Sequence, residues 1–287
     1  MVDLVARAQR SWRLIKASTA VLQDDGELLL LPILSGAATL AVGGAFIWQA
    51  MNDGTLEGLK TGQTTLSASF YVWLFAFYLV QYFVIIFFNT ALVGAALDRL
   101  DGRDPTIRSA LGLAITRIGP IFGYAIVSAT VGLLLRFIGE KLGIIGRLFE
   151  AGGGLAWTVT TFLVVPVLAA EGIGPVEAIV RSVGLLRKTW GENIVGTAGI
   201  SLVIGVFAFA VCLVFAGSLQ LMPANHAIAM ALMIACAAAF IAIFAFGAAL
   251  SAVYSAAVYY YAVIGEPPDG FDRDLIRGAF GPKGGTE

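Results

Sequence analysis

Residues 69–97 read SFYVWLFAFYLVQYFVIIFFNTALVGAAL, a stretch of apolar and aromatic residues without a single charge. A helix needs about 20 predominantly apolar residues to cross a bilayer, so this stretch predicts a transmembrane helix. Five further runs of the same kind flank it: Leu28–Ala50, Ile118–Leu135, Gly154–Ala170, Ile194–Leu219 and Ala227–Ile264. We therefore expect an all-α, polytopic membrane bundle of about six transmembrane helices.

The composition supports a membrane protein. Hydrophobic residues make up 59% of the chain and charged residues 13%, whereas a soluble domain carries roughly 45–50% apolar and about 25% charged residues. The mean hydropathy is +0.87. The net charge of −1 gives no indication of a nucleic-acid partner.

The distribution of basic residues predicts the orientation. Residues 1–27, 98–117, 171–193 and the segment from 265 hold fourteen of the eighteen Lys and Arg residues, and the alternate connections hold the other four. Because basic loops stay in the cytoplasm, both termini are expected there. We expect one domain over 1–287, with an amphipathic helix over 1–27, spans over 28–264 and a cytoplasmic tail over 265–287. No cleavable signal peptide is expected, since the first apolar run is too long for one.

A short motif follows each even-numbered span. It reads Gly102-Arg-Asp-Pro105, Gly172-Ile-Gly-Pro175 and Gly265-Glu-Pro-Pro268. Glycine allows the turn that ends a helix, and proline fits the first position of the next one. Amphipathic segments follow the first two motifs, and the N-terminus has the same character. The sequence therefore indicates three copies of an amphipathic helix followed by two spans, although three ordinary membrane-surface linkers would give the same spacing.

Two other local features bear on the spans. Pro166, in the fourth span, removes the hydrogen bond to the Phe162 carbonyl and is expected to kink the helix. The connection from Arg136 to Gly154 carries mixed apolar and charged residues, which would suit a short surface helix on the outer side.

The chain offers little for catalysis or ion coupling. No ionisable residue falls at the middle of a span, which argues against transport coupled to protons or sodium. The chain has one histidine, His226, and two cysteines, Cys212 and Cys236. It also lacks the common catalytic motifs. We expect no enzyme activity, no cofactor and no metal site.

Polar residues form a stripe along the second span. They are Tyr71, Tyr78, Tyr82 and Asn89, with Gln81 on the flank. The sixth span offers Ser251, Tyr254 and Ser255 on one face. These residues either line a cavity between the two spans or form ordinary hydrogen bonds between helices, and the sequence leaves both interpretations open.

The leading functional hypothesis is a non-enzymatic membrane protein that engages lipid or a partner protein through its basic amphipathic helices. The residues expected to meet anionic headgroups are Arg7, Arg10, Arg13, Lys16, Arg108, Arg117, Arg181, Arg187 and Lys188. The first alternative is an uncoupled transporter or channel for a small apolar or lipid-like solute. The second is an assembly subunit that binds another membrane protein or a copy of itself, which predicts an exposed small-residue groove on one span.

Two stretches resemble known families. Ser11-Trp-Arg-Leu-Ile-Lys16-Ala-Ser18, followed by Asp25-Gly-Glu27 and Pro32-Ile-Leu-Ser35, resembles a family of uncharacterised bacterial membrane proteins, a domain of unknown function. The stretch from Glu171 to Ser182 is similar to a looser set of six-span proteins, which includes the membrane domain fused to some glycerophosphodiester phosphodiesterases. The resemblance implies the helical fold and a bacterial inner-membrane location, and it brings no catalytic residues.

Overall fold

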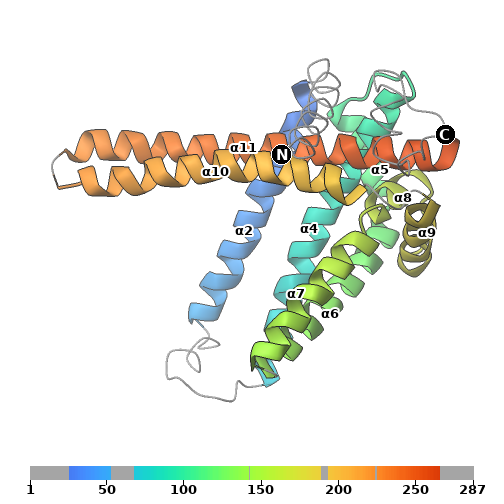
Figure 1. Ribbon diagram of the computed structural model, residues 1–287, viewed down its shortest axis with the longest axis horizontal. Helices are drawn as coiled ribbons and strands as arrows, with labels where there is room; N and C mark the ends of the chain where they lie inside the picture. The colour runs from blue at the N-terminus through green and yellow to red at the C-terminus, as the bar shows by residue number, and fades with distance from the viewer. Residues whose placement is uncertain (1–25, 53–67, 142, 189–192, 224, 266–287) are drawn as a thin grey trace, which may run out of the picture. The chain divides into compact units, whose positions relative to one another are not determined.

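The computed structural model describes residues 26–52, 68–141, 143–188, 193–223 and 225–265, and these form helices joined by short turns. The elements are η1 (Gly26–Leu29), α2 (Leu30–Asn52), α4 (Ala68–Leu100), α5 (Ile107–Thr116), α6 (Ile118–Lys141), α7 (Gly143–Thr160), α8 (Val164–Ala170), α9 (Pro175–Lys188), α10 (Asn193–Leu221) and α11 (His226–Ile264). Figure 1 labels the α-helices. The all-α prediction is confirmed for the described residues.

Six helices of the described chain are long and apolar enough to cross a membrane. Each coincides with one of the predicted runs, which confirms the number and the places of the spans. They are Gly26–Asn52, Ser69–Leu100, Ile118–Gly139, Glu150–Ala170, Val203–Leu221 and His226–Ile264.

The described helices divide into two compact units. One unit contains 34–94 and 108–186, and the other contains the described parts of 1–33, 95–107 and 187–287. The hairpin of α6 and α7 belongs to the first unit, and the hairpin of α10 and α11 belongs to the second.

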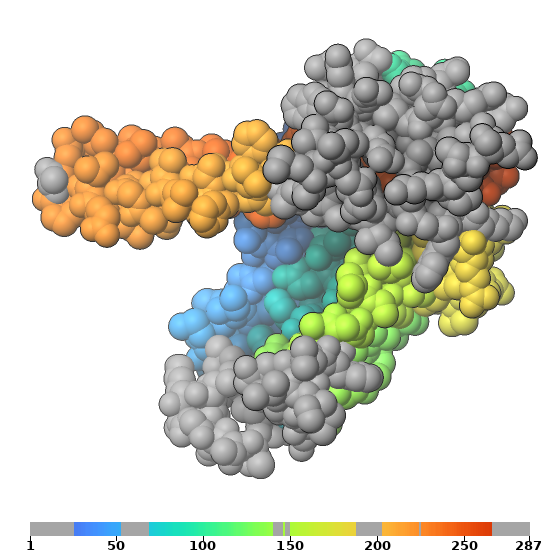
Figure 2. Space-filling view, viewed as in Figure 1, coloured from blue at the N-terminus to red at the C-terminus, as the bar shows by residue number. Residues whose placement is uncertain are grey.

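The α10–α11 hairpin is held by close contact between its two helices, whose surfaces meet along the visible face in Figure 2. Gly247 of α11 lies against the Ile204 side chain of α10, so closely that a Cβ at Gly247 would overlap it. Asn225 caps α11, because its side-chain oxygen accepts a hydrogen bond of 3.2 Å from the Ile228 N–H. Gly247 therefore serves packing inside this hairpin.

Left-handed glycines end three of the helices, as the repeated motif predicts. Gly102 follows α4 with φ of 77°, Gly172 follows α8 with φ of 64°, and Gly265 follows α11 with φ of 82°. After α4, the Gly102 N–H donates to the Arg99 carbonyl oxygen and the Arg103 N–H to that of Asp98. This pair of bonds is the Schellman motif, which satisfies carbonyl groups at a helix end.

The prolines of the motif differ in position. Pro175 is the first residue of α9, as predicted, whereas Pro105 stands two residues before α5 begins at Ile107. Thr106 occupies the place immediately before α5, and threonine is favoured there because its hydroxyl can cap the first turn. Pro268 lies outside the described residues.

Fully buried side chains concentrate toward the C-terminal ends of α4, α8 and α11. In α4 they include Ala91, Leu92 and Ala96, each no more than 1% exposed. In α11 every residue from Ala249 to Tyr259 is buried except Ser251, which is exposed. Small residues predominate in both places, and they allow helices to approach closely where no hydrophobic driving force acts between them.

The connection expected from Arg136 to Gly154 is shorter than predicted, since the spans run to Gly139 and from Glu150. Helix α6 continues to Lys141 and α7 begins at Gly143, so the two helices form a hairpin. The sequence misleads here because the apolar run stops at Leu135. Charged residues such as Arg136 and Glu150 are good helix formers, however, and they extend the helices beyond the most apolar part of the span.

Three consecutive glycines of α7 offer a matched test of this hairpin. A Cβ at Gly153 would stand 2.7 Å from Leu135 Cδ2 of α6, whereas a Cβ at Gly152 would meet nothing within 4 Å. We expect Gly153→Leu to destabilise the protein by about 1–3 kcal/mol through overpacking. Gly152→Leu is expected to be neutral or stabilising. Unfolding in mixed micelles with SDS measures both, and equal effects of the two substitutions would contradict the packing shown.

Candidate functional site

The predicted lipid-contacting residues fall into three groups. Part of the set lies outside the described residues: Arg7, Arg10, Arg13, Lys16 and the side chain of Lys188. Arg108 on α5 and Arg187 on α9 are exposed. Arg117 and Arg181 make contacts within the protein instead.

Arg117 and Arg181 both hold the link between α8 and α9. The guanidinium of Arg117 lies against Gly172, where a Cβ would overlap it. The Arg117 Nε is buried and has no hydrogen-bond partner among the described residues. Arg181 Nε donates to Glu171 Oε1 over 3.0 Å. These two arginines are thus partly engaged in fixing the turn before α9, which sequence reasoning did not foresee.

The surface helices α5 and α9 each present one inner and one outer face. Ala178, Ser182 and Leu185 of α9 are no more than 2% exposed, whereas Val176 and Val180 are 65% and 66% exposed. On α5 the inner residues are Ala110 and Ala114, and Ile115 is 59% exposed on the outside. Small inner residues let both helices sit close to their neighbours.

The apolar face predicted for α9 is consequently divided between two environments. Leu186 is buried and Val176 is exposed, while Ile179 and Val183 are half-buried. Helix α9 is seated on Ala178, Ser182, Leu185 and Leu186, and Pro175 at its start fits against Gly123 of α6. A Cβ at Gly123 would stand 3.0 Å from Pro175 Cγ.

The polar stripe of α4 contacts α6. Arg136 Nη1 donates to the Tyr78 hydroxyl oxygen over 3.0 Å. The ring of Tyr78 stacks on that of Tyr82, with centroids 6.2 Å apart, and the ring of Tyr71 meets Phe137 edge-on. A Cβ at Gly132 would stand 3.2 Å from the Tyr82 hydroxyl oxygen.

A second stripe on α6 faces these tyrosines and was missed from the sequence. It comprises Tyr124, Ser128, Gly132 and Arg136, which recur every four residues and share one helical face. The Tyr124 side chain is buried, and Ser128 follows it one helical turn later on the same face of α6. Its ring stacks on Trp157 of α7 at 6.5 Å. The spacing alone could have revealed the stripe, but none of the four residue types is notable individually.

We call this set the tyrosine seam; it consists of Tyr78, Tyr82, Tyr124, Ser128, Thr161 and Arg136. Its members come from α4, α6 and the turn after α7, all within one compact unit. The seam contains hydroxyls and one guanidinium, so it can donate and accept hydrogen bonds in an apolar bundle. Such bonds specify which helices pair.

The remaining cavity candidates are placed as follows. Gln81 faces α2, where its Nε2 donates to the Thr39 carbonyl oxygen over 3.1 Å and its buried Oε1 has no partner among the described residues. Asn89 is half-buried. Ser251 is exposed, Tyr254 is buried, and the Ser255 hydroxyl donates to the Ala252 carbonyl oxygen of its own helix. These last three belong to the other compact unit, and the cavity stays a prediction.

Where a kink is expected at Pro166, a turn at residues 161–163 interrupts the α-helix of the fourth span. Helix α7 ends at Thr160 and α8 begins at Val164. The Phe162 N–H donates to the Val159 carbonyl oxygen and the Val164 N–H to that of Thr161, each one residue closer than in an α-helix. This shift leaves the Leu163 N–H and the Thr160 carbonyl without their α-helical partners.

Ser182 of α9 satisfies both of these groups. Its fully buried hydroxyl accepts from the Leu163 N–H over 3.2 Å and donates to the Thr160 carbonyl oxygen over 2.7 Å. Backbone polar groups inside a bilayer must be paired within the protein, because the surrounding hydrocarbon offers no partner. Ser182 therefore connects the surface helix α9 to the interrupted span.

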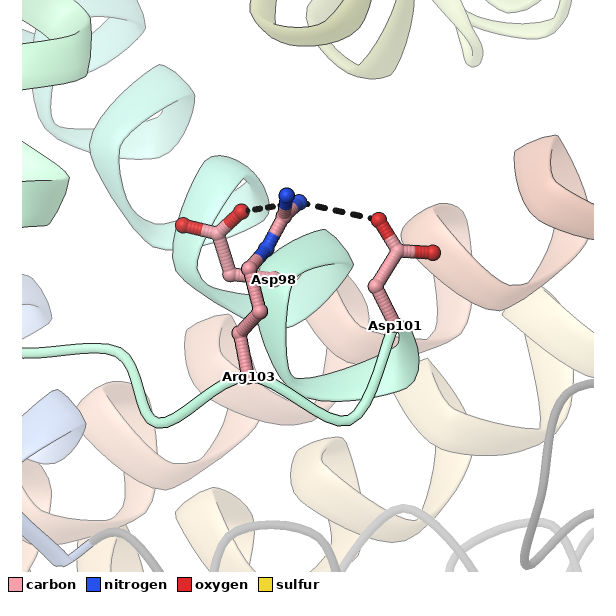
Figure 3. Close-up of polar contacts among 3 residues, drawn as sticks. All are labelled: Asp98, Asp101 and Arg103. Carbon is pink, nitrogen blue, oxygen red and sulfur yellow. Dashed lines mark hydrogen bonds and ion pairs between the residues drawn. The ribbon is translucent and has the colours of Figure 1, made fainter.

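Charges at the end of α4 are paired with one another. Figure 3 shows Arg103 between Asp98 and Asp101, with its Nη2 2.6 Å from Asp98 Oδ1 and 2.9 Å from Asp101 Oδ2. Arg99 pairs likewise with Asp104 at 3.1 Å. Exposed pairs of this kind contribute only about 0–1 kcal/mol each. They nevertheless occupy basic groups that would otherwise be available to a ligand.

The fold defines the class of protein. Six apolar helices of spanning length, with short amphipathic helices between them, make this chain a multi-pass α-helical membrane protein. Residues 68–269 match the family of unknown function DUF6159, and the chain belongs to that family. No curated protein matches the sequence.

The family match bears differently on the two resemblances. The matched region runs from α4 to just beyond α11, so it includes the tyrosine seam and Ser182. Membership of an uncharacterised family is confirmed, although the stretch from Ser11 to Ser35 that suggested it lies outside the matched residues. The likeness to the membrane domain of glycerophosphodiester phosphodiesterases stays a prediction.

Proposed function

We propose that the protein is a non-enzymatic component of a bacterial inner membrane that engages anionic lipid through α5, α9 and the basic N-terminal segment. Both termini would lie in the cytoplasm, and the bias of fourteen basic residues to four supports this orientation. Because residues 172–175 and 102–105 share a motif, α9 and α5 follow at equivalent points of the chain, each after an inward-running span.

The outer face of α9 is the observation that carries the proposal. Val176 and Val180 are about two-thirds exposed on a helix whose inner face is fully buried, and Arg187 is exposed on the same helix. A helix that shows apolar side chains and arginine outward suits the boundary between headgroups and acyl chains. The valines would enter the lipid and the arginine would meet a phosphate.

Substitution of Arg108 and Arg187 by glutamine tests this proposal. Each basic residue near an anionic surface contributes about 1 kcal/mol, so the double variant is expected to bind anionic lipid roughly 30-fold more weakly. Native mass spectrometry of the protein with phosphatidylglycerol measures the retained lipid. Arg103→Gln is the matched control, because Arg103 is already paired with two aspartates and should change retention little.

The results separate the possible outcomes. Equal retention by the double variant and the wild type, with the reversal of Arg7, Arg10, Arg13 and Lys16 to Glu also without effect, would refute lipid engagement. Loss in the Arg103→Gln control as well would show a general charge effect rather than binding at α5 and α9.

The tyrosine seam and the interrupted fourth span favour a second candidate function, an uncoupled transporter of a lipid-like solute. Interrupted spans are common at the binding sites of transporters. Reconstituted vesicles with a fluorescent short-chain phospholipid provide the test. Protein-dependent movement of the probe between leaflets, lost in Tyr82→Leu, would favour this function over lipid engagement without transport.

An exposed row of small residues on α11 bears on the third candidate, an assembly subunit. The row consists of Ala227, Ala231, Ala235, Ala238 and Ala242. Small residues at this spacing allow another helix to approach. A change from an oligomer to a monomer on Ala235→Leu, measured by native mass spectrometry, would support self-assembly, and a monomer in both proteins would exclude it.

A further inference from the structure

The two opposite faces of α9 have different surroundings. The inner face of α9 inserts one hydroxyl into a gap in the backbone of another helix, while its outer face carries Val176 and Val180 outward. A single rigid helix thus touches both the proposed lipid surface and the break between α7 and α8.

We propose that Ser182 transmits the engagement of α9 with an anionic lipid surface to the tyrosine seam. The inference rests on the proposed function and adds a route by which lipid binding changes the interior of the bundle. The route runs from the outer face of α9 through Ser182 to the segment 161–163, and from there through Thr161 and Trp157 to Tyr124.

The first step of the route is the pair of bonds at Ser182. Pro166 prevents the fourth span from closing into a regular helix, because it lacks an N–H and its ring clashes with the preceding turn. In the turn at 161–163 the Leu163 N–H and the Thr160 carbonyl lack their α-helical partners and bond to the Ser182 hydroxyl instead. A movement of α9 must either carry these backbone groups with it or leave them unpaired, so the two elements move together.

The second step joins the break to the seam. The Thr161 hydroxyl donates to the Trp157 carbonyl oxygen over 2.8 Å, which ties the turn at 161–163 to Trp157. Trp157 itself stacks on Tyr124 with 22° between the ring planes. A shift of 161–163 thus alters the surroundings of Trp157, which lies on the last turn of α7.

The contact between Pro175 and Gly123 sets how α9 can move. It fixes the first turn of the helix against α6, and the Arg181–Glu171 pair ties its second turn to the end of α8. Headgroup contacts at Val180 and Arg187 lie farther along the helix. They would tilt α9 about its first turn and act directly on Ser182.

Trp157 fluorescence tests the route. The reporter protein retains Trp157, with Trp12, Trp48, Trp73 and Trp190 replaced by Phe, and is placed in nanodiscs of neutral phosphatidylcholine or of phosphatidylcholine with anionic phosphatidylglycerol. We expect the emission of Trp157 to differ between the two lipid compositions. Ser182→Ala should abolish this difference while the anionic lipid is still retained in native mass spectrometry.

Two further variants keep the test decisive. Ser182→Thr keeps a hydroxyl and should preserve the response. A response that is kept in Ser182→Thr and lost in Ser182→Ala would show that the hydroxyl's hydrogen bonds, and not the position of α9 alone, carry the effect. Ser218→Ala is the matched control, because Ser218 is equally buried but bonds only to the Phe215 carbonyl of its own helix. It should leave the response unchanged. If Ser182→Ala does not fold, Pro166→Ala replaces it, since repair of the break should also remove the response.

The outcomes distinguish this inference from the function on which it rests. Retained anionic lipid without any change in Trp157 emission, or an undiminished change in Ser182→Ala, would overturn the transmission through Ser182 and leave lipid engagement standing. Absence of retained anionic lipid in the wild type would overturn both.

Discussion

Replacement of Gly172 by valine is expected to destabilise the protein by about 2–4 kcal/mol, because an L-residue at positive φ costs roughly 1–3 kcal/mol and a β-branched one more. Gly172 has a φ of 64°. Its Cβ would in addition overlap the Arg117 guanidinium, which must then leave its place beside the α8–α9 turn. The loss should appear as a lower SDS midpoint in mixed-micelle unfolding.

A control and a double-mutant cycle separate the two causes. Gly184 lies on the exposed side of α9, and a Cβ there would meet nothing within 4 Å, so Gly184→Val should be neutral or slightly stabilising, because valine has a higher helix propensity than glycine. In an Arg117→Ala background, Gly172→Val should retain the backbone strain and lose the overlap. Equal costs for Gly172→Val and Gly184→Val would contradict the left-handed conformation at Gly172.

The spans were predictable from the sequence because their signal is local. A run such as 69–97 is predominantly apolar and carries no charge on any face, so neither helical rotation nor tertiary contacts enter the prediction. The helix ends were predictable for a similar reason. Gly102, Gly172 and Gly265 each stand where only a left-handed turn can close the preceding helix, and glycine has the least steric cost there.

The partners of the polar residues could not be predicted in this way. The sequence predicts the polar stripe on the second span. The contacts of that stripe, however, depend on which neighbouring helix places small residues opposite the tyrosine rings. Gly132 of α6 meets this need for Tyr82. Arg136 was assigned to a connection because the apolar run ends one residue before it, whereas the helix continues and brings it to Tyr78.

The role of Ser182 was hidden for a different reason. Pro166 predicts a break and therefore two backbone groups in need of partners, but the sequence does not say which side chain will satisfy them. The partner comes from a helix about twenty residues along the chain, on a face where alanine and leucine are its neighbours. A serine among alanine and leucine residues forms no sequence pattern that indicates a role. Only its hydrogen bonds in the structure identify Ser182 as the partner of the two backbone groups.

The substitution Ser182→Ala is expected to have the largest effect on stability. It removes the partner of the Leu163 N–H and of the Thr160 carbonyl at once, and each unpaired buried group costs about 1–3 kcal/mol. A loss of about 2–5 kcal/mol follows from the two groups together. The same unfolding measurement should show it as a lower SDS midpoint.

Pro166→Ala provides the decisive comparison for this effect. With an N–H restored and the proline ring removed, the fourth span can form regular α-helical bonds, and the Leu163 N–H and Thr160 carbonyl no longer depend on Ser182. The cost of Ser182→Ala should therefore fall to that of an ordinary buried hydroxyl when it is measured in the Pro166→Ala background. A cost unchanged by Pro166→Ala would mean that Ser182 stabilises α9 by another route, and the interrupted span would then be independent of the surface helix.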